Sequence, residues 1–142
     1  MTLDIRLDAG MIRGDVPLQR LGGLNRSLGA FSVFGAFRSL RGRPHIGEKH
    51  AALSVEHNFR TVPVEILRLG GLAKRGAEVM IFGSMGRVWE DDNRVSVYPL
   101  EDEFIFEVGI SINKLFYALR LDVTKRLDRN DYFLSISLPR FY

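Results

Sequence analysis

Tyr132-Phe-Leu-Ser-Ile-Ser-Leu-Pro-Arg-Phe-Tyr142, the last eleven residues of the chain, alternate between apolar and small polar side chains. Consecutive side chains of a β-strand point to opposite faces, so this alternation predicts a strand with one apolar and one polar face. The apolar parity contains Leu134, Ile136, Leu138 and Tyr142. An apolar stripe that ends on an aromatic residue is typical of the closing strand of a transmembrane β-barrel. A soluble edge strand shows the same alternation, but less often ends on an aromatic residue.

Five more segments alternate in the same way, at residues 2–11, 50–59, 77–87, 104–112 and 116–125. With the last segment they predict an all-β chain of about six antiparallel strands. The second faces carry mainly charged and small side chains. A soluble sandwich would also expose such a face, so alternation alone does not separate the two classes. Aromatic residues near the strand ends favour a barrel with interfacial girdles.

The connections between these segments differ in character. Residues 18–48 form a long stretch rich in glycine and arginine, which is typical of a segment that is either functional or disordered. Residues 64–69 form a short amphipathic piece closed by Gly70-Gly71, suited either to a membrane surface or to an ordinary packed turn. Tight turns are expected at Asn113-Lys114 and at residues 127–131.

Composition limits the possible classes of function. The length of 142 residues allows one domain, or a piece of a larger one, so residues 1–142 are treated as a single partial domain. The chain is 46% hydrophobic, but no stretch approaches the ~20 apolar residues of a membrane helix, so a membrane role must come from strands. The net charge of +3 comes without a dense basic run, which argues against a nucleic-acid partner.

Residues that could carry catalysis or bind a metal do not form known patterns. The absence of cysteine excludes disulfides and thiolate sites. His45, His50 and His57 do not have zinc-site spacing. Ser84 lies between glycines, but Phe82 breaks the G-x-S-x-G nucleophile motif. We therefore expect no enzyme activity, no metal and no cofactor.

Three landmarks follow one another along the chain. The first comprises Leu21-Gly-Gly23 and Ser39-Leu-Arg-Gly42, the second is Ser54-Val-Glu-His-Asn-Phe59, and the third is Phe82-Gly-Ser-Met-Gly-Arg-Val-Trp89 with Leu119-Arg-Leu-Asp122. In this order they resemble the C-terminal part of the bacterial surface-antigen superfamily of outer-membrane β-barrels, which is BamA/TamA-like. That resemblance implies a sixteen-stranded barrel, with a long loop folded back into the lumen and held there by an arginine.

The resemblance also implies which residues hold that loop. Arg41 and Gly42 match the Arg-Gly motif of the loop, while Glu56 and Asp122 match inward acids on neighbouring strands. Two positions depart from the family pattern: Arg43 replaces an aromatic residue, and Ser84 replaces an acid. We therefore expect an Arg41–Glu56 pair in which Glu56 takes over from the missing acid.

These observations give one main expectation and two alternatives. The chain is expected to be the C-terminal portion of a transmembrane β-barrel in the bacterial outer membrane, in a protein related to protein insertion or translocation or to surface antigens. Its partners would be outer-membrane lipid, the rest of the barrel and client outer-membrane proteins. Six strands do not close a barrel, and the segment after Met1 is not a secretory signal, so we expect a fragment of a longer chain. The alternatives are the barrel anchor of a patatin-like esterase whose catalytic domain is absent, and a soluble ligand-binding β-barrel.

Overall fold

The computed structural model describes residues 1–13, 22–26, 34–40, 45–89 and 104–139. Its helices and strands, in chain order, are β1 (Thr2–Met11), β2 (Gly22–Gly23), β3 (Ile46–Gly47), β4 (Lys49–Asn58), α1 (Val62–Ile66), α2 (Gly70–Lys74), β5 (Glu78–Trp89), β6 (Ile105–Leu115), β7 (Leu119–Arg126) and β8 (Asp131–Ser137). No helix in these ranges is long and apolar enough to cross a membrane.

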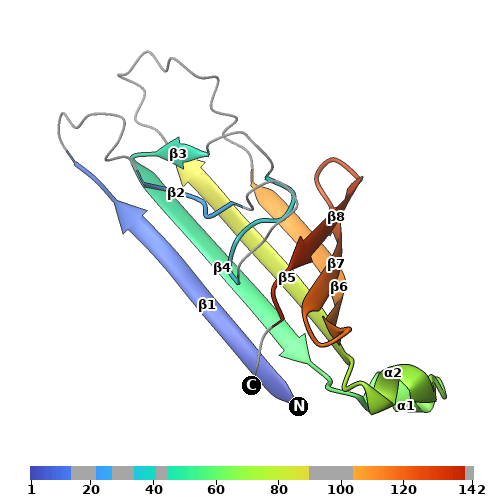
Figure 1. Cartoon of the computed structure of the whole chain (residues 1–142). Helices are drawn as coiled ribbons and strands as arrows, with labels where there is room; N and C mark the ends of the chain where they lie inside the picture. The colour runs from blue at the N-terminus through green and yellow to red at the C-terminus, as the bar shows by residue number, and fades with distance from the viewer. Residues whose placement is uncertain (14–21, 27–33, 41–44, 90–103, 140–142) are drawn as a thin grey trace.

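One antiparallel sheet dominates the molecule. Its six strands run in the order β1-β4-β5-β6-β7-β8, and β2 and β3 form a separate two-stranded sheet. The sheet curls, so that β8 comes forward of β6 and β7 (Figure 1). The predicted all-β class with about six antiparallel strands is therefore confirmed. Among the described residues, β1 and β8 each pair with a single neighbour and form the two edges of the sheet.

The inner face of the sheet is polar and buried, which reverses the usual distribution in a soluble protein. Strand pairing places the buried side chains of adjacent strands in register, for example Ser54 opposite Ser84 and Ser84 opposite Glu107. The buried polar and charged residues on this face are Ser54, Glu56, Asn58, Glu78, Ser84, Glu107, Ser111, Asn113, Arg120, Asp122, Thr124, Arg126, Ser135 and Ser137.

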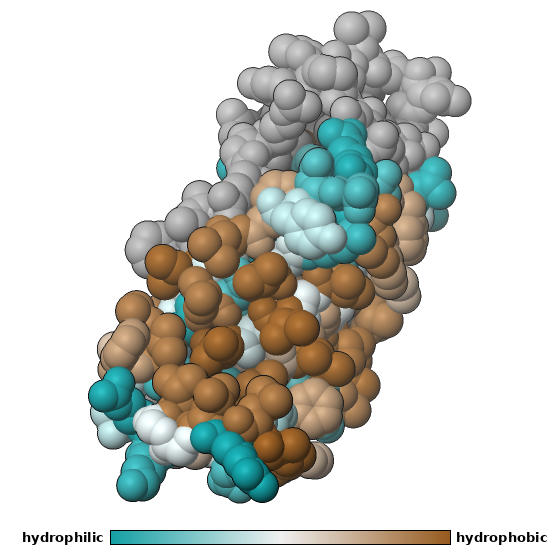
Figure 2. Space-filling model, turned by 90° about the vertical axis from the view of Figure 1, so that its right-hand side faces the viewer, coloured by the Kyte–Doolittle hydropathy of each residue, from teal (hydrophilic) through white to brown (hydrophobic). Residues whose placement is uncertain are grey.

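The outer face is apolar and exposed. Its large exposed side chains are Leu3, Ile5, Leu7, Met11, Ile81, Phe104, Phe106, Ile110, Leu119, Val123, Tyr132, Leu134, Ile136 and Leu138. Figure 2 shows apolar side chains gathered into a broad field on the side of the molecule where β6–β8 lie, with hydrophilic side chains at its lower end. Both faces follow from the period-two alternation in the sequence.

Part of the long β1–β4 connection covers the inner face. Residues 34–40 are buried except for Phe34, which is half-buried. A small apolar cluster anchors this segment to the sheet and consists of Leu24, Phe37, Leu40, Ala52, Val88 and Ile105. Gly86 on β5 makes room for it, since a Cβ there would lie 2.7 Å from the Phe37 ring. The segment 34–40 is called the inner segment below.

Two details of the connections differ from the sequence predictions. Strand β6 continues through Asn113-Lys114 to Leu115, because the Asn113 side chain is buried on the inner face and donates a hydrogen bond to Glu78. The turn is at residues 116–118, where Phe116 and Tyr117 have positive φ. Gly70-Gly71 begins α2 rather than ending the preceding piece. The turn predicted at residues 127–131 is present at 127–130.

Candidate functional site: a buried arginine–carboxylate network

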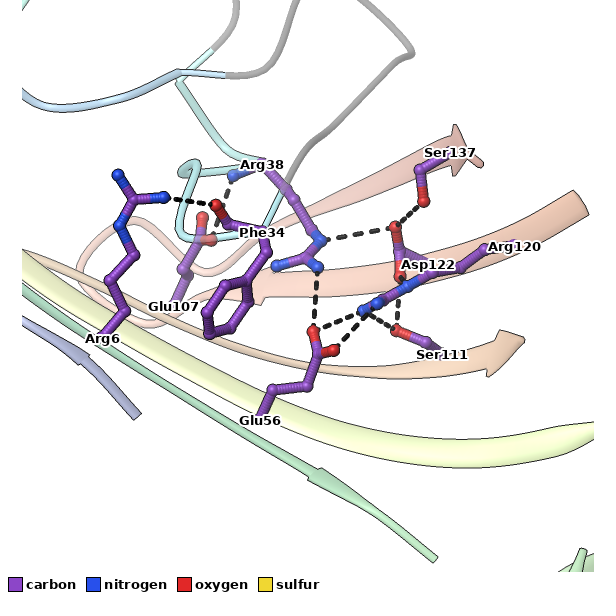
Figure 3. A network of polar contacts seen from close by, with 9 residues as sticks. All are labelled: Arg6, Phe34, Arg38, Glu56, Glu107, Ser111, Arg120, Asp122 and Ser137. Atoms are coloured by element: carbon purple, nitrogen blue, oxygen red, sulfur yellow. Dashed lines mark hydrogen bonds and ion pairs between the residues drawn. The ribbon is translucent and has the colours of Figure 1, made fainter. Parts of the chain in front are cut away.

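A cluster of charged side chains lies between the inner segment and the sheet (Figure 3). Alternation along β4 turns Glu56 inward, and alternation along β7 turns both Arg120 and Asp122 inward. Strand β6 adds Glu107 and Ser111, and the inner segment adds Arg38. Five charged groups from four separate parts of the chain therefore meet at one place.

Arg120 forms the centre of this network. Its Nη1 and Nη2 donate to the two carboxylate oxygens of Glu56, at 2.9 and 2.7 Å. Its Nε donates to Asp122 Oδ1 at 2.7 Å, and Nη2 also donates to Ser111 Oγ at 2.9 Å. A planar guanidinium matches a carboxylate in this paired geometry, which fixes the distance between β4 and β7 across the two intervening strands.

Arg38 reaches the same two carboxylates from the opposite side. Its Nη2 lies 3.5 Å from Glu56 Oε2, and its Nε lies 3.4 Å from Asp122 Oδ2. The guanidinium carbon lies 3.7 Å from the centre of the Phe82 ring, within the range of a cation–π contact. Arg38 is thus held by two charges and by one aromatic face.

Glu107 holds the main chain of the inner segment. Its Oε1 accepts a hydrogen bond from the N–H of Arg38 at 3.0 Å, and its Oε2 accepts one from the N–H of Ser39 at 2.9 Å. Both oxygens are therefore used on adjacent peptide groups. Hydrogen bonds to an ionised acceptor are about twice as strong as those between neutral groups. The segment is consequently fixed by its backbone as well as by its side chain.

Hydroxyl groups complete the environment of Asp122. Ser111 Oγ donates to Oδ1, and Ser137 Oγ donates to Oδ2 at 3.2 Å. Because Ser137 belongs to β8, the network spans the sheet from β4 to its edge. Asp122 itself is completely buried.

The network is dry. Arg38 and Arg120 are 3% and 2% exposed, and Glu56, Glu107 and Asp122 are at most 1% exposed. Removing one partner from such a cluster leaves other charges buried without compensation, which typically costs about 3–5 kcal/mol. This arrangement therefore favours one position of the inner segment over all others.

Contacts to β1 hold the start of the inner segment. Arg6 Nη1 donates to the carbonyl of Phe34 at 3.0 Å. Asn25 accepts a hydrogen bond from the N–H of Phe37 at 2.8 Å and donates from its Nδ2 to Asp8 Oδ2 at 2.9 Å. Gly35 has a φ of +76°, and a Cβ there would lie only 2.6 Å from Arg6 Cδ. The glycine therefore allows both the turn and the close approach of Arg6.

The predicted site residues fall into three groups. Glu56 and Asp122 are buried on the inner face and share the network just described. Leu134, Ile136 and Leu138 are exposed on the outer face of β8 and just beyond it. Arg41, Gly42 and Tyr142 lie outside the described residues, so the Arg41–Glu56 pair stays a prediction.

Sequence reasoning missed Arg38, Arg120 and Glu107 as members of the site. For Arg120 a signal was present, since it shares the inward parity with Asp122 two residues later. For Glu107 no such signal was present within its own strand. It stands directly opposite Ser84 in the β5–β6 pairing, and Ser84 occupies the position where the resemblance expects an acid. An acid therefore faces Ser84 from the neighbouring strand, and no single-strand motif would reveal it.

The histidines are spread over the molecule. His50 Nε2 lies 3.8 Å from Asp8 on the inner side, whereas His57 stacks edge-on against Phe59 at 4.4 Å. Within the described ranges, no group of three or more His, Asp or Glu side chains is placed to hold a metal ion.

Comparison of the chain with models of known protein families, with curated protein sequences and with solved structures returned no match.

Proposed function

We propose that this chain forms the C-terminal part of a transmembrane β-barrel in the bacterial outer membrane, with the inner segment locked inside the lumen by the arginine–carboxylate network. The observation that carries this proposal is the reversed distribution of polarity. Fourteen buried side chains of the inner face are polar or charged, while large apolar side chains of five strands are exposed. Lipid is the solvent in which that arrangement is stable.

An apolar hollow on the outer face of the sheet favours a lipid-facing barrel over a soluble ligand-binding barrel. A soluble barrel would have apolar side chains inside, around its ligand. Here a hollow of about 590 Å³ lies beside Gly83, and most of its lining side chains, such as Val55, Ile81 and Val108, belong to the outer face. Acyl chains of the bilayer would fill it.

The proposed role of the parent protein is to insert or translocate proteins at the outer membrane, or to act as a related surface antigen. The support is the resemblance of the ordered motifs, together with the contacts of Arg38, in the β1–β4 connection, with the acids Glu56 and Asp122 on the inner face of the sheet. The proposal includes client outer-membrane proteins as partners and no catalysis by this chain. A patatin-like esterase anchored by this chain would instead have a hydrolase domain encoded upstream of Met1, which the coding DNA would reveal.

Single-cysteine labelling tests the membrane placement, because the chain has no native cysteine. Ile110→Cys places a fluorophore on the outer face, and Arg129→Cys places one in the exposed β7–β8 turn, away from the apolar face. In reconstituted vesicles, nitroxide-bearing lipids should quench the first label and not the second. A soluble monomer without detergent, with no quenching at residue 110, would overturn the proposal.

The role in assembly has a separate test. Replacing the chromosomal codon for Arg38 with that for alanine should lower the amounts of other outer-membrane barrels, measured by quantitative proteomics of isolated outer membranes. Arg13→Ala, at an exposed site, is the matched control. Unchanged barrel levels in the Arg38 variant, despite a loosened loop, would argue against an insertion role and for a surface-antigen role.

A further inference from the structure

The β4–β5 connection, residues 59–77, forms a compact projection at one end of the sheet. Helices α1 and α2 make up this projection, and they lie at the end opposite β2 and β3 (Figure 1). Its base continues the strand ladder, since Phe59 N donates to Val79 O and Val79 N donates to Arg60 O, each at 3.0 Å. We call residues 59–77 the helical hairpin.

The hairpin buries little of its apolar surface. Val64 is 4% exposed and packs toward the sheet, but Ile66 and Leu67 are 74% and 67% exposed. Val62 and Leu69 are also exposed. On the neighbouring β6–β7 turn, Phe116 and Tyr117 add two exposed aromatic rings at the same end. Aromatic and aliphatic side chains at this level are typical of the interface between lipid and water.

The hairpin also carries the excess charge of the chain. Four of its residues are basic and Glu65 is its only acid, so it has a net charge of +3. The whole chain has the same formal net charge of +3, so the remaining residues sum to zero. The basic residues are Arg60, Arg68, Lys74 and Arg75.

Two of these arginines share a shallow depression. Arg68 and Arg75 line a hollow of about 450 Å³, together with Leu69 and Leu72. The guanidinium carbon of Arg75 lies 5.7 Å from the centre of the Phe116 ring, which links the hairpin to the aromatic turn. A site with cations beside leucines and aromatic rings matches a phospholipid, in which a headgroup phosphate lies above the acyl chains.

We propose that the helical hairpin docks onto the surface of an anionic phospholipid leaflet, with its leucine and isoleucine side chains in the interfacial layer and its arginines on the lipid phosphates. This inference rests on the proposed function, because it takes the outer face of the sheet to lie in the same bilayer. The hairpin then fixes how deeply this end of the sheet lies in the membrane.

A label at Leu67→Cys tests the docking, since that side chain is exposed and its replacement removes no packing. The labelled full chain is reconstituted in vesicles of phosphatidylcholine alone or with phosphatidylglycerol. We expect a blue-shifted emission and quenching by headgroup-proximal nitroxide lipids, both stronger with phosphatidylglycerol and weaker at high salt.

Two double variants test whether docking of the helical hairpin depends on its arginine charges. Arg60 and Arg68 have φ values of 58° and 56°, so Arg60→Gly with Arg68→Gly removes two charges at positions where glycine is favoured by the backbone. We expect this variant to lose the phosphatidylglycerol dependence while the sheet stays folded. Arg13→Gln with Arg129→Gln removes two charges at the opposite end and should keep that dependence.

The label at Ile110→Cys, measured in parallel, separates this inference from the proposed function. Quenching at both positions supports both. Quenching at residue 110 alone overturns the docking and leaves the barrel proposal standing. Quenching at residue 67 alone supports docking as a peripheral contact and overturns the barrel proposal. An equal response of the Leu67→Cys label to inorganic phosphate in lipid-free detergent would identify a soluble phosphate as the occupant and overturn the docking.

Discussion

Arg120 illustrates how one buried side chain can tie together distant strands. It contacts Glu56, which is 64 residues away, and Asp122, which is two residues away, and it uses all three of its nitrogens to do so. Lysine could not reproduce this geometry, because a single ammonium group lacks the planar fork. The residue is therefore a structural support for the position that Arg38 occupies.

We expect Arg120→Met to reduce the free energy of unfolding by about 3–5 kcal/mol, because Glu56 and Asp122 would stay buried with one cation fewer. Urea unfolding in detergent micelles measures the change. Arg13→Met, at an exposed position, should stay within about 0.5 kcal/mol of the parent chain. A loss below about 1 kcal/mol in the Arg120 variant would mean that water enters the network and screens its charges.

Glu107 allows a smaller and more specific change. Glu107→Gln keeps the size of the side chain but replaces one acceptor oxygen with an NH₂ group, which faces a main-chain N–H. We expect a loss of about 1–3 kcal/mol and faster proteolysis of the connection between β1 and β4. Glu65→Gln, in the hairpin at the other end of the sheet, is the control. Unchanged cleavage in the Glu107 variant would show that Arg38 alone holds the inner segment.

At the scale of elements, the strands and the turn at residues 127–130 were predictable, but two other connections were not. Alternation identified the first strand at residues 2–11, matching β1 (Thr2–Met11), because period two survives any tertiary context that keeps one face apolar. Gly70-Gly71 misled because glycine usually ends helices, whereas here it begins a short one that packing stabilises. The turn after β6 shifted because buried Asn113 stands opposite Glu78 on the adjacent strand β5 and donates a hydrogen bond to it.

Helix α2 and the residue after its C-cap offer a paired glycine test. Gly71 lies inside α2, and a Cβ there would meet no atom within 4 Å. Gly71→Ala should therefore stabilise the chain by about 0.5–1 kcal/mol. Gly76 has a φ of +71°, so Gly76→Ala should destabilise it by about 1–2 kcal/mol. Thermal unfolding of both variants checks this, and equal effects of the same sign would contradict the helical geometry.

An ion pair in the β7–β8 turn makes the stability of the fold depend on pH. Arg126 Nε donates to both carboxylate oxygens of Asp128 at 2.8 Å. Burial alone would raise the pKa of Asp128, but the hydrogen bonds and charge of Arg126 outweigh it and hold the pKa below the usual 3.8. A lowered folded-state pKa means that the contribution to stability is complete well above pH 3.8 and is lost as the pH falls below it.

Asp128→Asn should remove this acid-side loss. We expect it to lower stability at neutral pH by no more than about 1 kcal/mol, since the turn is near the surface. The difference from the parent chain should vanish at the acidic end of a pH series of urea unfolding curves. A difference that stayed constant over the whole pH range would show that the Arg126–Asp128 pair does not depend on ionisation.

At the scale of the whole molecule, the informative property is which face of the sheet is buried. Alternation alone predicts two faces of different polarity on each strand, but not which face is turned inward, because both a soluble sandwich and a lipid-facing barrel satisfy it. The site was predictable only in part for a similar reason. Glu56 and Asp122 lie in the predicted direction, whereas Arg38 and Glu107 meet through contacts between distant segments.

A charge introduced on the outer face tests whether lipid or water covers that face. Ile110→Lys should destabilise the chain in lipid by about 2–4 kcal/mol, because the residue lies in the middle of β6. Tyr117→Lys, in the turn, should cost at most about 1 kcal/mol. Refolding into vesicles of defined thickness and urea titration measure both. A neutral or stabilising effect at residue 110 would indicate that water covers this face.

The contacts of Arg38 also set the order in which the molecule can be completed. The inner segment is bound by Glu107, which follows it by 69 residues, and by Asp122 on β7. During synthesis and folding it therefore finds its partners only after β6 and β7 have been made and aligned, and contacts of such long sequence separation form slowly. The closure of the inner segment is a signal of assembly: a loop that resists protease belongs to a molecule whose sheet has already been built through β7.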